Sequence, residues 1–150
     1  MIPESRLIRS ELTIRELSLP QDVLLARKSL IRWLALSLGL ILPNESRRLL
    51  LDLLDAVLEF HVRKQNPTTK DILIKLKEMT KEEPNPKAVY YHLQRLKDFG
   101  VLSRKKGRYY LGDGETEDLR EIFRSCYLKR ADKAFDNISS ALDRLESSYM

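Results

Sequence analysis

The chain has 150 residues, of which 43% are hydrophobic and 33% charged, and its net charge is +5. This length suits one domain with extensions better than two independent domains. The longest nearly uncharged stretch, residues 30–43, contains Arg32 and is too short to cross a bilayer. The N-terminus lacks the basic-then-apolar order of a secretory signal. We therefore expect a cytoplasmic protein.

Few residues suit a metal site or a catalytic role. Cys126 is the single cysteine, so no internal disulfide can form, and only His61 and His92 accompany it as soft or borderline metal ligands. No zinc-site spacing is present. The chain also lacks a glycine-rich phosphate loop, a serine elbow and a paired-acid motif. We expect no metal, no cofactor and no enzymatic activity.

Basic side chains concentrate in the middle of the chain. Residues 46–112 hold 15 basic and 8 acidic residues, whereas residues 1–45 hold 6 and 5, and residues 113–150 hold 6 and 9. Within the middle segment, residues 86–108 contain seven basic residues and one acid, Asp98. Such a localised excess is expected of a surface that binds nucleic acid.

The first third of the chain predicts an arm and a helix. Residues 1–19 alternate loosely between apolar and charged positions, which fits either an extended arm or a short helix. From Pro20 a helix is predicted to about Leu38, and because it is apolar on more than one face, we expect it to pack against a large surface. Gly39 and Pro43 are expected to end it.

Three helices and a hairpin are predicted next. Apolar residues recur at helical spacing over about residues 47–64, 69–79 and 86–99. Two short apolar and aromatic runs around a turn at residues 105–107 predict a β-hairpin. The boundaries are indicated by residues that cap helices: Asn44 or Ser46, Thr68 or Thr69, Asn85, and Gly100 after the third helix.

The tail from about Thr116 is predicted to be a single helix, since it contains no proline or glycine beyond that point. Apolar residues over 128–149 are spaced alternately by three and four, which is the seam of a coiled coil. We expect this seam to form a homodimer; the alternative is that it covers the N-terminal helix of the same chain. The predicted dimer-interface residues are Leu128, Ala131, Phe135, Ile138, Leu142, Leu145 and Tyr149.

The order of helices, glycine and hairpin is the layout of a winged helix, and the sequence itself resembles that family. Residues 88–102 read Ala-Val-Tyr-Tyr-His-Leu-Gln-Arg-Leu-Lys-Asp-Phe-Gly-Val-Leu. This stretch resembles the recognition-helix signature of archaeal and bacterial winged-helix transcription regulators. The resemblance implies a winged helix-turn-helix at 46–112. Together with the elements predicted on either side, it gives a mainly α-helical protein with an N-terminal arm and helix at 1–45 and a C-terminal dimerisation helix at 113–150.

A DNA-binding surface follows from this interpretation. An α-helix fits the major groove, where Gln pairs with adenine and Arg with guanine, while Tyr and Lys reach phosphates. The hairpin resembles a wing that rests on the backbone or enters the minor groove. The predicted DNA-binding residues are Lys87, Tyr90, Tyr91, Gln94, Arg95, Arg104, Lys105, Lys106 and Arg108.

The predicted function is that of a duplex-DNA-binding transcriptional regulator that acts as a homodimer away from membranes. The alternative is a winged-helix protein–protein interaction module in a transcription, replication or membrane-remodelling assembly, in which the recognition helix need not touch DNA. The charge excess over residues 86–108 favours DNA.

Overall fold

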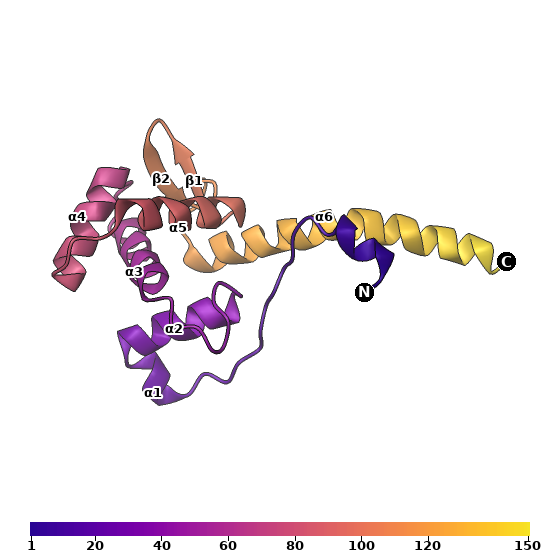
Figure 1. Cartoon of the computed structure of the whole chain (residues 1–150), viewed down its shortest axis with the longest axis horizontal. Coiled ribbons are helices and arrows are strands. Elements are labelled where there is room, and N and C mark those ends of the chain that lie inside the picture. The colour runs from indigo at the N-terminus through magenta and orange to yellow at the C-terminus, as the bar shows by residue number, and fades with distance from the viewer. The chain divides into compact units, whose positions relative to one another are not determined.

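The computed structural model describes residues 1–150 and divides into two compact units, Met1–Ser46 and Arg47–Met150. The regular elements of the first unit are all helices, and the second unit combines helices with a two-stranded antiparallel hairpin (Figure 1). The fold is therefore mainly α-helical, as predicted. No helix combines the length and the hydropathy that crossing a membrane requires.

The first unit contains a 3₁₀ turn at Pro3–Leu7 and two helices, α1 (Gln21–Leu24) and α2 (Arg27–Ser37). The single helix predicted from residue 20 to residue 38 is wrong in one respect. It is interrupted at Ala26, where the backbone is extended (φ −115°, ψ 110°), and no side chain there explains the break.

An extended part of the arm is held against the end of α2 by Arg15. Its guanidinium donates hydrogen bonds to the carbonyl oxygens of Leu36 (2.7 Å) and Ile41 (3.0 Å). The last carbonyl groups of a helix have no partner within the helix, so a basic side chain at this end stabilises it. The indole N–H of Trp33 donates to the carbonyl oxygen of Ser18 (2.7 Å), which fixes a second point of the arm.

The second unit has the element order of a winged helix-turn-helix. Helices α3 (Arg48–Val62), α4 (Thr69–Thr80) and α5 (Pro86–Asp98) precede strands β1 (Leu102–Lys105) and β2 (Arg108–Leu111), and α6 (Leu119–Ser148) follows. Helix α3 packs against α4, α5 and β2, while β1 packs against α5. The largest fully buried side chains of this core are Leu50, Leu53, Leu54, Ile72, Leu76, Val89, Leu93, Leu96 and Val101.

The predicted caps of α4 and α5 are confirmed. Thr68 and Asp71 form a reciprocal capping box, in which each side chain accepts from the other residue's backbone N–H at 3.1 and 3.0 Å. These hydrogen bonds lower the pKa of Asp71, because they favour the charged carboxylate. The Asn85 side chain accepts from the backbone N–H of Lys87 (3.0 Å) and so caps α5.

The predicted cap of α3 is wrong. The helix begins at Arg48, and the residue before it, Arg47, makes no side-chain capping bond. The N-cap position of α3 is therefore held by Arg47, and neither Asn44 nor Ser46 occupies it.

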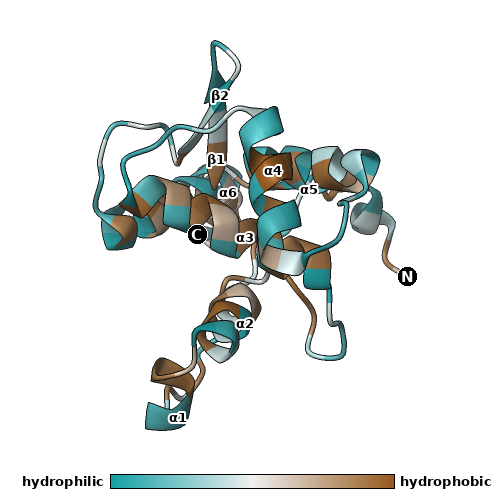
Figure 2. Ribbon diagram, turned by 90° about the vertical axis from the view of Figure 1, so that its left-hand side faces the viewer, coloured by the Kyte–Doolittle hydropathy of each residue, from teal (hydrophilic) through white to brown (hydrophobic).

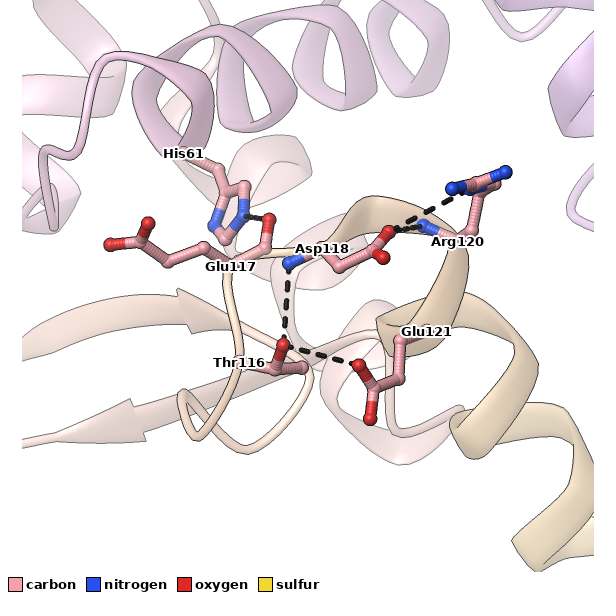
Figure 3. A network of polar contacts seen from close by, with 6 residues as sticks. All are labelled: His61, Thr116, Glu117, Asp118, Arg120 and Glu121. Atoms are coloured by element: carbon pink, nitrogen blue, oxygen red, sulfur yellow. Dashed lines mark hydrogen bonds and ion pairs between the residues drawn. The ribbon is translucent and has the colours of Figure 1, made fainter.

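The start of α6 is fixed to the end of α3 by a network of polar contacts (Figure 3). Asp118 caps α6 by accepting from the backbone N–H of Arg120 (3.0 Å), and its own N–H donates to the Thr116 hydroxyl (3.3 Å). Nε2 of His61 lies 2.9 Å from the carbonyl oxygen of Glu117. Because that oxygen only accepts, Nε2 must carry the proton.

Helix α6 has two halves with different environments. In its first half Ile122, Cys126 and Tyr127 are buried, and the thiol of Cys126 donates to the carbonyl oxygen of Phe99 (2.9 Å). Burial raises the pKa of this thiol. From residue 132 onward every residue is exposed, and the helix extends beyond the winged-helix core (Figure 1).

Candidate nucleic-acid interface

Helix α5 has the buried and exposed faces that its sequence predicts. Val89, Leu93 and Leu96 are at most 1% exposed and point into the core. On the other faces, the structure leaves four predicted DNA-binding side chains exposed: Lys87, Tyr90, Tyr91 and Gln94.

Gln94 is exposed but has a partner one turn along the helix. Its side-chain amide donates to a carboxylate oxygen of Asp98 at 3.0 Å. Pairs of this spacing on a helix surface contribute only about 0.2–0.5 kcal/mol. The amide is therefore available to exchange this contact for another.

Arg95 differs from the other predicted site residues on α5, because it is half-buried. The carbon of its guanidinium lies 5.9 Å from the ring centre of Tyr91 and 5.7 Å from that of Phe99, and Nη1 is buried without a hydrogen-bond partner. Arg130 of α6 lies 4.8 Å from the same Phe99 ring. Two guanidinium groups thus share one ring, which connects the end of α5 to α6.

His92 belongs to the buried side of α5. It is 8% exposed, its ring meets that of Tyr91 edge-on at 5.3 Å, and its Nδ1 has no hydrogen-bond partner. Burial lowers the pKa of this imidazole, and the nearby positive charges of Arg95 and Arg47 lower it further. His92 is therefore a neutral packing residue.

The wing ends in a two-residue turn that points Lys106 outward. Strand register pairs Lys105 with Arg108, so Lys106 and Gly107 make the turn. Both have positive φ, 52° and 79°, which is the pattern of a type I′ turn, whose twist matches that of antiparallel strands. The Lys106 side chain is exposed and makes no hydrogen bond or ion pair.

Two other wing cations lie over aromatic rings. The guanidinium of Arg104 is 5.4 Å from the ring centre of Tyr109, and Nζ of Lys105 is 5.6 Å from that of Tyr110. The same ammonium donates to the carbonyl oxygen of Asp113. These contacts orient both side chains along the hairpin, and both remain exposed.

Arg108 anchors the wing to the connection between α3 and α4. Its guanidinium donates to the carbonyl oxygen of Asn66 (2.8 Å), and its backbone forms a bridge with Thr68. The next residue, Tyr109, donates its N–H to the carbonyl oxygen of Pro67 (2.8 Å). This contact of β2 with residues 66–68 was not predicted, because no local sequence pattern marks those residues as a partner of the hairpin.

Of the nine predicted DNA-binding residues, eight are exposed and Arg95 is half-buried. The hairpin that carries four of them is hydrophilic towards its tip and hydrophobic at its base (Figure 2). Because β1 packs against α5, the wing and the helix belong to the same unit.

The other predicted surface is the seam of α6. Ala131 is half-buried, and the remaining six seam residues are between 44% and 80% exposed. Nowhere do three His, Cys, Asp or Glu side chains gather in a way that suits a metal ion.

Compared with protein-family models, curated proteins and solved structures, the chain has no match.

Proposed function

We propose that the winged-helix unit binds duplex DNA, with α5 in the major groove and the wing on the backbone or in the minor groove, and that the protein acts as a transcriptional regulator. The observation that carries the proposal is the seven-to-one ratio of basic to acidic residues over 86–108, which covers α5 and the hairpin. Most of these basic side chains are exposed. Localised positive charge of this kind attracts the phosphate backbone.

The proposed contacts divide into base reading and backbone binding. Gln94 is the exposed side chain whose chemistry suits base reading, because an amide makes two hydrogen bonds to adenine. Lys87, next to the positive N-terminal end of α5, and Lys106, at the wing tip, suit phosphates. Tyr90 and Tyr91 offer hydroxyl groups to the backbone on either side of this helix face.

The experiment is a mobility-shift titration with duplex DNA at several salt concentrations. The variant replaces Lys87 and Lys106 by Ala, since neither side chain makes a hydrogen bond or ion pair that its removal would break. The matched control replaces Lys28 and Lys133, two exposed lysines outside the proposed surface, and loses the same charge.

We expect the parent protein to bind DNA and to lose affinity steeply as salt rises. The Lys87/Lys106 variant should bind all sequences more weakly, and its slope of log affinity against log salt should be smaller by up to about 1.8, for two lost phosphate contacts. The control should match the parent. Failure of the parent to bind duplex DNA at low salt would overturn the proposal and favour a protein-interaction module instead.

A further inference from the structure

The second half of α6 carries an apolar face that its own unit does not cover. Residues 132–150 are exposed throughout, although Phe135, Ile138, Leu142 and Leu145 lie along one side of the helix. A helix segment of this length is marginal in water without a partner, because most helix stability comes from packing an apolar face. The face therefore requires an occupant.

This face is not a continuation of the surface with which α6 packs on the winged-helix core. At about 100° per residue, the seam is turned by roughly 170° from the side of the helix that carries Ile122 and Cys126. Continued along the helix, the core-facing side carries Lys129, Arg130 and Lys133 instead of apolar residues. The core cannot bury the seam without breaking its own contacts with α6.

We propose that the seam pairs with the seam of a second copy of this chain in an antiparallel two-helix coil whose two-fold axis passes near residue 140. The inference does not depend on DNA binding. It rests on the match between the seam and its own reversed copy and on the small residues that flank the seam.

The reversed pairing places the smallest seam residue opposite one of the largest. With the axis near residue 140, Ala131 faces Tyr149 of the second copy, and Ile138 faces Leu142 of the second copy. Phe135 then faces Leu145 of the second copy. A parallel pairing in register would instead place Tyr149 against Tyr149 and Ala131 against Ala131, which gives one overfilled layer and one underfilled layer. Cores favour even filling of volume over this unevenness.

One flank of the seam is lined by small residues. Ala134, Ala141 and Ser148 occupy the same heptad position beside the seam. In an antiparallel coil such positions face each other, so Ala141 meets Ala141 of the second copy, and Ala134 meets Ser148 of the second copy. No long charged side chain separates the two helices on this flank, and they can approach closely.

The first test measures the mass of the full chain by light scattering at tens of micromolar. The parent should be a dimer, and the variant with Ile138→Asp and Leu142→Asp should be a monomer with an intact core. The matched control introduces the same two charges at Ser140 and Ser147, on the opposite side of the helix, and should remain a dimer. A monomeric parent would overturn the proposal, and the seam would then cover another part of the same chain.

The second test determines orientation by disulfide cross-linking under mild oxidation. Ala141→Cys should cross-link, because residue 141 lies beside its own copy across the axis. Leu145→Cys should not, because it lies about 15 Å along the helix from its own copy. The parent, whose buried Cys126 is its single thiol, is the control. Cross-linking of Leu145→Cys without Ala141→Cys would overturn the antiparallel arrangement.

Discussion

Arg95 lies along the surface of α5, over the rings of Tyr91 and Phe99. Its sequence position predicts a guanine contact, whereas its surroundings indicate that it also holds the end of the helix. We expect Arg95→Ala to lower the free energy of unfolding by about 1 kcal/mol through loss of these ring contacts. Denaturant titration measures this effect, and an unchanged midpoint would contradict it.

Unlike Arg95, Gln94 should contribute to DNA binding and not to the stability of the fold. We expect Gln94→Ala to leave stability nearly unchanged, because its single contact is with Asp98 on the helix surface. On a preferred DNA site, selected from a random pool, the variant should lose about 1–3 kcal/mol of binding free energy. Competition between that site and random DNA is the measurement. An equal loss of affinity on the preferred site and on random DNA would show that Gln94 contacts the DNA backbone instead of a base.

His92 makes stability depend on pH. Because burial lowers its pKa below the usual 6.5, the folded protein prefers the neutral ring more strongly than the unfolded chain does. The contribution of His92 to the free energy of unfolding is therefore fully present above about pH 6.5, and it is lost as the pH falls through the lowered pKa. Thermal unfolding between about pH 7 and pH 5 should show a smaller decrease for His92→Gln than for the parent. If the parent and His92→Gln lose the same stability over this pH range, His92 does not cause the pH dependence.

Among the elements, the hairpin is sensitive to glycine substitution at two places, for different reasons. At Gly107 an added Cβ meets nothing within 4 Å, so Gly107→Ala should cost only the left-handed backbone strain of about 1–2 kcal/mol. At Gly112, with φ of +62°, the Cβ would lie 2.9 Å from a methyl carbon of Ile122 in α6. Denaturant titration should therefore show that Gly112→Ala lowers the free energy of unfolding more than Gly107→Ala does. If Gly107→Ala is the more destabilising change, α6 must be able to shift and relieve the contact at Ile122.

The helices and the hairpin of residues 46–112 follow from local patterns. Thr68 and Asn85 mark helix starts because a capping side chain bonds to backbone only two or three residues away. The turn at Lys106 and Gly107 is equally local. The break at Ala26 has no such signal, and a continuous helix was the natural prediction.

The parts of the candidate site that sequence did not predict depend on distant residues. Arg108 reaches Asn66, 42 positions earlier, and Arg130 shares the ring of Phe99 with Arg95. Spacing rules cover neighbours on one helix or one hairpin, so they identify the exposed cations but not what holds them. The same rules explain why the exposure of Lys106 was predicted and the half-burial of Arg95 was not.

If the winged-helix unit binds DNA and the α6 seam pairs two copies of the chain, DNA affinity should depend on the seam. A dimer that engages two half-sites gains affinity because its second contact is effectively intramolecular. Ile138→Asp with Leu142→Asp should therefore bind a duplex with two half-sites about 10²-fold or more weakly, but bind a single half-site nearly as the parent does. The Ser140/Ser147 control, with equal added charge, should keep the affinity of the parent on both. If the variant and the control lose equal DNA affinity, the added negative charge alone explains the loss.

Helix α6 is one continuous helix with a buried first half and an exposed second half. Its two halves should therefore differ in the free energy of local opening. Amide hydrogens near Ile122 and Cys126 exchange with solvent only when the core opens, at a rate independent of protein concentration. If the seam pairs as proposed, amide hydrogens from residue 132 to the end of α6 should be protected only in the dimer. Their exchange should slow as the protein is concentrated, so the tail of this helix would report, residue by residue, the fraction of chains that are assembled.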